Sequence, residues 1–74
     1  MPKPISGRQT VRVLERYFGF MIVKQRGSHV KLRKATPAGM VTTVVPLHRE
    51  LAHGTLRGIL HLAKIEYEDF QKFM

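Results

Sequence analysis

A Gly-Ser pair between two β-prone segments constrains the fold of this chain more than any other feature. The segments span residues 20–26 and 30–34, and Gly27-Ser28 separates them, with His29 directly after the pair. Such a pair is typical of a two-residue hairpin turn in which glycine takes the positive φ of the first central position. The sequence therefore predicts an antiparallel hairpin whose register is set by this turn.

The predicted register divides the hairpin into two faces. Directly opposed residues point to the same side of a ribbon, and side chains alternate along each strand. One face then combines three opposed pairs, namely Arg26 with His29, Lys24 with Lys31, and Ile22 with Arg33. The other face, which we expect to build the core, carries Met21, Val23, Gln25, Val30 and Leu32. The first face thus presents one imidazole among four basic side chains.

The charge of the chain indicates a polyanionic partner. The 74 residues include 13 Lys and Arg against 5 Asp and Glu, which gives a formal net charge of +8. Most of the basic residues lie in the first half of the sequence, whereas three of the acids cluster between residues 66 and 69. Nucleic acid or an acidic protein is the expected partner of such a surface. The length predicts one small domain over residues 1–74, near the size at which a single core barely outweighs chain entropy.

Several classes of protein are disfavoured by what the sequence lacks. It contains no cysteine, which excludes disulfides and thiolate metal sites. No apolar run approaches the roughly 18 residues of a membrane span, so we expect a cytoplasmic protein without a membrane partner. His48 and His53 have no third ligand at a recognisable spacing, and we therefore expect neither a metal nor another cofactor.

An amphipathic helix is predicted to precede the hairpin. Ser6 and Gln9 have the spacing of a capping box, and Gly19 is expected to end the helix that begins at Gly7 and extends to about Phe18. One arc of this helix should pack on the sheet, and it contains Thr10, Val11, Val13, Leu14, Tyr17 and Phe18. A second arc carries Arg8, Arg12 and Arg16, whose mutual repulsion a bound anion would relieve. A solvated charged face explains these three arginines equally well.

The remainder of the chain completes an α+β pattern. A third strand is expected over residues 40–45, although the pattern does not decide which alternate side chains face inward. A second helix should run from Gly54 or Thr55 to Lys64, and a short third helix over residues 65–74. The expected fold is an αβββα sandwich with helices on one face of a three-stranded antiparallel sheet.

Four short motifs make the chain similar to a known family. In order they are Ser6-Gly7, Gly27-Ser28-His29, Val45-Pro46-Leu47-His48, and Gly54-Thr55-Leu56-Arg57 followed by Ile59-Leu60. Their order and approximate spacing resemble those of HicA-type toxins, and the resemblance extends from about Ser6 to Phe70. Two positions depart from the family pattern. Val30 stands where a second histidine is frequent, and Glu66-Tyr67 stands where the last helix often opens with a serine-type cap.

The resemblance implies a fold, an activity and a partner. HicA-type toxins are small prokaryotic endoribonucleases, or mRNA interferases, with a fold like that of a double-stranded RNA-binding domain. The chain would accordingly be the toxin of a type II toxin–antitoxin system, cleaving mRNA with His29 as the catalytic residue. A HicB-like antitoxin would neutralise it. No DNA partner is expected for the toxin alone.

The residues themselves support metal-independent RNA cleavage. Histidine can both accept and donate a proton near neutral pH, and the RNA 2′-hydroxyl is an internal nucleophile beside the phosphate. Basic side chains would hold the phosphate, and glycine would allow close approach of the RNA backbone. The predicted RNA contacts are Lys24, Arg26, Gly27, Ser28, Lys31, Arg33, Arg8, Arg12 and Arg57. No second acid–base group is evident.

Two other functions fit the same sequence. A noncatalytic RNA-binding module of the same fold would use the basic surface to follow phosphates, with His29 serving only as a hydrogen-bond donor. A basic adaptor would instead bind an acidic protein and have negligible RNA affinity. His48 is expected to make a structural hydrogen bond or an RNA contact, and His61 to be an ordinary surface residue.

Overall fold

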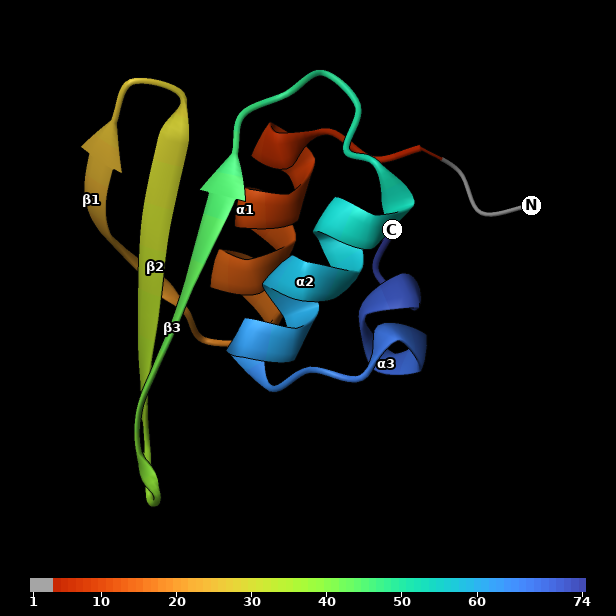
Figure 1. Ribbon diagram of the computed structural model, residues 1–74. Coiled ribbons are helices and arrows are strands. Elements are labelled where there is room, and N and C mark those ends of the chain that lie inside the picture. Colours follow the sequence, from red (N-terminus) through yellow and green to blue (C-terminus); the bar gives the residue numbers. More distant parts are fainter. Residues whose placement is uncertain (1–3) are drawn as a thin grey trace.

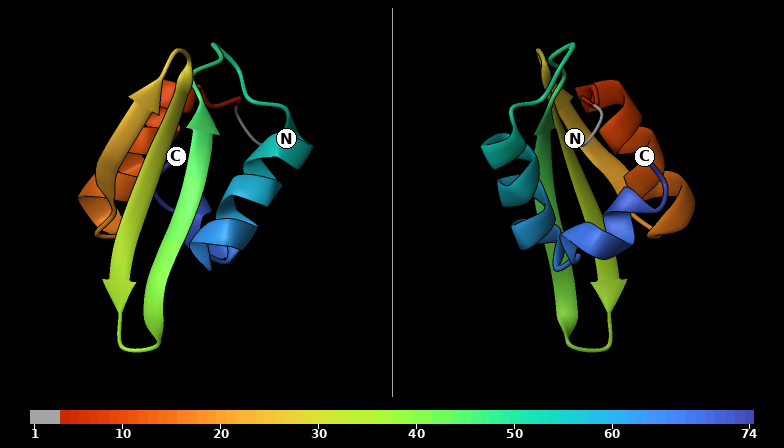
Figure 2. Two further views of the ribbon diagram at one scale, coloured as in Figure 1. Left: turned by 60° about the vertical axis from the view of Figure 1, so that its left-hand side comes forward. Right: turned by 90° about the vertical axis from the view of Figure 1, so that its right-hand side faces the viewer.

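The protein is a three-stranded antiparallel sheet with helices packed on one of its faces (Figure 1). This computed structural model describes residues 4–74. The elements in chain order are α1 (Gly7–Tyr17), β1 (Met21–Arg26), β2 (His29–Thr36), β3 (Gly39–Pro46), α2 (His53–Ala63) and α3 (Tyr67–Gln71). Figure 2 shows that no helix of residues 4–74 covers the opposite face of the sheet. The predicted α+β sandwich is confirmed.

The start of α1 has the hydrogen bonds of the predicted capping box. The Gln9 N–H donates to Ser6 Oγ at 3.0 Å, and the Ser6 N–H donates to Gln9 Oε1 at 2.9 Å. The helix ends before Gly19, whose φ of 75° reverses the chain into β1. Most of the predicted apolar arc is buried against the sheet. Tyr17 is the exception, because it is 51% exposed and stacks on Phe73 with 4.2 Å between ring centroids.

The strands pair in the order β1-β2-β3, and the first hairpin contains a bulge that the sequence does not reveal. Arg26 lies opposite His29 and Lys24 opposite Lys31, as predicted. The register then shifts between Ile22 and Lys24. A bulge adds one residue to one strand and so exchanges the faces of the residues beyond it.

The bulge makes part of the predicted register wrong. Arg33 lies opposite Met21 rather than Ile22, and Ile22 lies opposite the buried Leu32. Met21 therefore belongs to the open face, where it is 70% exposed, while Ile22 moves to the helix side. Val23 lies within the bulge and is 45% exposed, so it does not build the core. Val30 and Leu32 do build the core, as predicted.

The third strand directs alternate residues toward the helices. Thr43 and Val45 are buried, which decides the orientation that the sequence left open. The Thr43 hydroxyl donates to the Ile59 carbonyl of α2 at 2.8 Å and so joins the sheet to that helix. A buried hydroxyl paired in this way avoids the cost of an unsatisfied polar group.

The second and third helices close the core. α2 buries Leu56, Ile59, Leu60 and Ala63, and Lys64 ends it in the left-handed conformation with φ 61°. α3 is shorter than predicted, but its Phe70 is fully buried. The core thus lies between the inner face of the sheet and the three helices, and the outer face of the sheet remains open (Figure 2).

Candidate nucleic-acid interface and catalytic histidine

The hairpin turn holds His29 at the first position of β2. Gly27 has a φ of 58°, and a Cβ added there would meet nothing within 4 Å. Glycine is therefore required at this position by backbone conformation and not by crowding. The Gln25 side-chain amide donates to the Gly27 carbonyl at 3.3 Å and braces the turn. The Ser28 carbonyl accepts a hydrogen bond from the Leu47 N–H at 2.6 Å.

Three of the sequence motifs meet at this end of the sheet. His29 pairs with Pro46 at the end of β3, and the Gly7 N–H donates to the His48 carbonyl at 2.9 Å. The start of α1 approaches this segment so closely that a Cβ on Gly7 would collide with the Pro46 carbonyl oxygen and lie 2.8 Å from the Leu47 Cα. Glycine at position 7 therefore allows the start of α1 to pack closely against the end of β3 and the turn.

The His29 side chain projects from the open face of the sheet. Val30, the next residue, is buried, and the alternation along β2 turns the imidazole away from the core. His29 is exposed, and its side chain has no hydrogen-bond partner among residues 4–74. The ring is therefore available to a ligand on this face.

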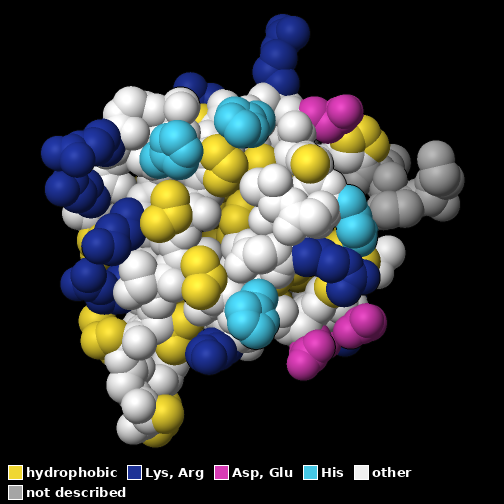
Figure 3. All heavy atoms as spheres, viewed as in Figure 1, with side chains coloured by type: hydrophobic (Ala, Val, Ile, Leu, Met, Phe, Trp, Pro, Cys, Tyr) yellow, Lys and Arg dark blue, Asp and Glu magenta, His cyan; other side chains and the backbone are white. Residues whose placement is uncertain are grey.

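The surroundings of His29 are strongly basic. Arg26 lies directly across the ladder from it, and Lys24 lies across from Lys31. Like charges opposite each other destabilise a sheet, and a bound anion would relieve this cost. Within the part of the chain that the structure describes, the one ion pair joins Lys72 and Asp69, far along the sequence at the end of α3. In Figure 3, Lys and Arg side chains gather on the sheet side of the molecule.

Arg33 extends the basic row along β2. Its Nε donates to the Thr42 Oγ1 on β3 at 3.4 Å, and the side chain is half-buried. The predicted contacts Lys24, Arg26, Lys31 and Arg33 are therefore brought together with His29 on one face. The same face exposes the apolar side chains of Met21, which was predicted to face the core, and of Met40 and Val44, which were not singled out in the sequence.

The predicted contacts of α1 lie around the edge of β1. Arg8 and Arg12 line a groove of about 240 Å³ between this helix and β1, whose apolar wall includes Val11, Ile22 and Val30. Leu47, which contacts the turn through its N–H, also lines the groove. Arg8 and Arg12 therefore lie on the helix side of β1 and not on the face that carries His29.

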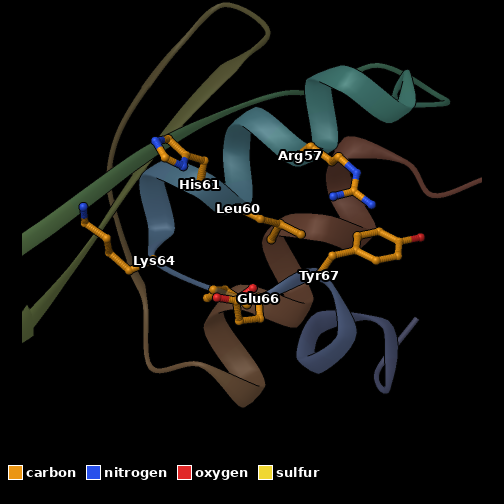
Figure 4. Close-up of a pocket in the computed structure, with 7 residues that line it drawn as sticks. Arg57, Leu60, His61, Lys64, Glu66 and Tyr67 are labelled. Atoms are coloured by element: carbon orange, nitrogen blue, oxygen red, sulfur yellow. The ribbon is translucent and has the colours of Figure 1, made fainter.

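Arg57 is not brought to the basic face. Figure 4 shows it on α2, pointing toward Tyr67 and away from the strands, in a groove of about 530 Å³ between α2 and α3. Its Nε donates to the His53 Nε2 at 3.0 Å, and its guanidinium carbon lies 4.9 Å from the Tyr67 ring centroid. We therefore leave Arg57 out of the proposed RNA-binding site.

Sequence reasoning missed how the segment from Leu47 to His48 joins the site. Nothing in the spacing of this segment predicts that it contacts both the turn and α1. The Val-Pro-Leu-His motif was the one available signal. Within residues 4–74, no three His, Asp or Glu side chains are placed to hold a metal ion. No helix in the same range is long and apolar enough to cross a membrane.

The fold and the site define a small basic domain with an accessible histidine on the open face of its sheet. The sequence model that describes the HicA toxin of bacterial toxin–antitoxin systems matches residues 7–65. The chain belongs to this family of toxins. A search of curated proteins finds no match.

Proposed function

We propose that this toxin acts as a metal-independent endoribonuclease with His29 as its catalytic acid–base group. The observation that carries the proposal is an exposed histidine, without a hydrogen-bond partner in residues 4–74, beside Arg26 in a row of basic side chains. Proton transfer by a positioned side chain typically contributes about 10²–10⁴-fold to a rate. The phosphate would lie against Arg26, Lys24 and Lys31, which offset the charge that develops on it.

The hairpin turn would admit the RNA backbone. Gly27 has open space around it, so a phosphodiester can approach the turn without meeting a side chain. Ser28 would contact the same strand, and Arg33 would extend the track along β2. Arg8 and Arg12 would bind neighbouring phosphates at the edge of β1. The target class is mRNA in the bacterial cytoplasm.

A HicB-like antitoxin is the proposed protein partner. The open face combines basic side chains with the exposed Met21, Met40 and Val44, a mixture suited to an acidic partner that also has an apolar contact surface. Such a partner would cover His29 and exclude RNA. A complex that leaves His29 open and still cleaves RNA would contradict this mode of neutralisation.

The direct test compares the wild-type protein with His29→Ala on a defined RNA in EDTA. Wild type should cleave, and the variant should lose about two to four orders of magnitude in rate. Both proteins should be repurified to remove contaminating nuclease, and both should bind RNA with similar affinity. A variant that cleaves as fast as wild type would exclude His29 as the catalytic residue.

The alternative RNA-binding module is separated by the same experiment. It predicts RNA binding that weakens steeply with salt, together with no cleavage by the wild-type protein with or without EDTA.

A further inference from the structure

The loop after β3 carries a second histidine to the end of the sheet where His29 lies. His48 follows Pro46 by two residues, and Pro46 pairs directly with His29. With about 5 Å across a strand pair and 3.8 Å per residue along the chain, the Cα atoms of the two histidines are separated by roughly 13 Å at most. The two side chains can therefore approach the same phosphodiester from different segments.

The backbone around His48 is fixed on both sides. The preceding N–H, from Leu47, donates to the Ser28 carbonyl at 2.6 Å, next to His29 in the chain. The His48 carbonyl itself accepts the Gly7 N–H at 2.9 Å. These two hydrogen bonds anchor the loop to both the hairpin turn and the first residue of α1. The His48 side chain remains exposed.

Histidine side chains are exposed near the end of the sheet where β3 finishes (Figure 3). The other two histidines, His53 and His61, both belong to α2. His53 accepts the hydrogen bond from Arg57, and His61 lines the groove between α2 and α3. Neither of these is held against the hairpin turn.

We propose that His48 is the second acid–base group of the reaction, paired with His29. The inference rests on the proposed ribonuclease function. His29 takes the proton from the 2′-hydroxyl as O2′ forms its bond to phosphorus. His48, in its protonated form, gives a proton to O5′ as the P–O5′ bond breaks. The products are a 2′,3′-cyclic phosphate and a 5′-hydroxyl, and no metal or oxidant takes part.

This division of roles follows from the positions of the two side chains. His29 lies opposite Arg26 and in the strand that carries Lys31, so a phosphate bound there places the adjacent 2′-hydroxyl near His29. His48 lies beyond the end of β3, on the side of the turn toward α1. The leaving oxygen is on the opposite side of phosphorus from the attacking oxygen in an in-line displacement, which requires two separate groups. A histidine is suited to either role.

A substrate with a sulfur leaving atom tests the acid role of His48. In such an RNA the bridging O5′ at the cleaved linkage is replaced by sulfur, and a thiolate leaves without protonation. His48→Ala should cleave ordinary RNA about 10²–10⁴-fold more slowly than wild type. It should cleave the sulfur-substituted RNA at nearly the wild-type rate. His29→Ala should be slow on both substrates.

Control variants separate chemistry from folding. His61→Ala should match wild type on both substrates, because His61 lies in the groove between α2 and α3. Glu50→Gln tests the exposed carboxylate of the same loop and should also match wild type. Urea unfolding of His48→Ala and His48→Gln shows whether each variant retains the fold. Cleavage of the sulfur-substituted RNA is then measured on a variant that is folded.

The outcomes distinguish this inference from the proposed function. Equal slowing of His48→Ala on both substrates, or wild-type cleavage of ordinary RNA by that variant, would overturn the acid role of His48 while leaving His29 as catalytic. Rescue by sulfur in Glu50→Gln instead of His48→Ala would assign the acid role to Glu50. Wild-type activity in His29→Ala would overturn the proposed function itself.

Discussion

Two of the histidines lie beside an arginine, and their surroundings differ in charge and in hydrogen bonding. His53 accepts a hydrogen bond from Arg57 at 3.0 Å and packs edge-on against Tyr67, with 5.4 Å between ring centroids. His29 lies across the ladder from Arg26, without a hydrogen-bond partner in residues 4–74 and with its ring exposed.

Proximity to an arginine does not by itself mark a functional site. Around His53 the Arg57 guanidinium donates to the imidazole and lies over the Tyr67 ring, which fastens α3 to α2, while the buried Tyr67 hydroxyl has no hydrogen-bond partner among residues 4–74. Around His29 the side-chain charges across the β1–β2 ladder are all positive, and a bound anion would reduce their mutual repulsion. The first cluster stabilises the fold, and the second is left open to an anion.

The largest expected effect is on catalysis. His29→Ala should lower the rate of RNA cleavage by about 10²–10⁴-fold, whereas His53→Ala should leave it within about twofold of wild type. Gel-based cleavage of one defined RNA measures both. A folded His53→Ala protein that loses as much activity as His29→Ala would show that the two histidines do not differ in role.

The next effect concerns the glycines of the two regions. Gly7→Ala places a Cβ against the Pro46 carbonyl and the Leu47 Cα, so we expect a loss of about 3 kcal/mol in the free energy of unfolding. Gly58 in α2 has nothing within 4 Å of an added Cβ. Gly58→Ala should therefore stabilise the protein by about 0.5–1 kcal/mol, through helix propensity alone. Urea unfolding gives both values, and equal effects at the two glycines would refute the close approach at Gly7.

A smaller effect is expected in the salt dependence of RNA binding. Replacing both Lys31 and Arg33 by Ala should reduce the slope of log K against log salt for single-stranded RNA by about 1.4, which corresponds to two lost phosphate contacts. Arg57→Ala should leave the slope unchanged, because Arg57 faces Tyr67 in the groove away from the strands. Fluorescence titrations of His29→Ala protein at several salt concentrations avoid cleavage during the measurement. A reduced slope for Arg57→Ala would return that residue to the interface.

The smallest effect is the stability contributed by the second cluster. Arg57→Ala removes a cation–π contact and a hydrogen bond to His53, and should cost about 1 kcal/mol. Arg16→Ala, an exposed arginine of α1, should change stability by less than about 0.5 kcal/mol. Thermal or urea unfolding of the two variants measures the difference. If the two arginines contribute equally, the cluster around Tyr67 does not fasten α3.

Much of this arrangement could be predicted from local sequence signals. The capping box at Ser6, the turn at Gly27 and the order of elements were all correct, because each depends on residues close together in the chain. The bulge between Ile22 and Lys24 was missed, because nothing in the sequence marks which residue is inserted into the ladder. It moved Met21 and Ile22 to the faces opposite to those predicted.

In the candidate site, too, the local features were predicted and the long-range contacts were missed. The place of His29 beside Arg26 and Lys31 follows from the turn, and was predicted. The contact of Leu47 with the turn and of His48 with Gly7 joins residues about 20 and 40 positions apart, through backbone groups that have no sequence signature. Such contacts can be identified only from the three-dimensional arrangement of the sheet and α1.

The most direct test of the central claim is the chemistry of the cleaved ends. RNA cleaved by the wild-type protein in EDTA should carry a 2′,3′-cyclic phosphate and a 5′-hydroxyl, because the attacking oxygen is the adjacent 2′-hydroxyl. A matched RNA with a single 2′-deoxy nucleotide on the 5′ side of the cleaved bond should resist cleavage. Equal cleavage of the deoxy substrate, or 5′-phosphate ends, would contradict a mechanism built on His29 and the 2′-hydroxyl.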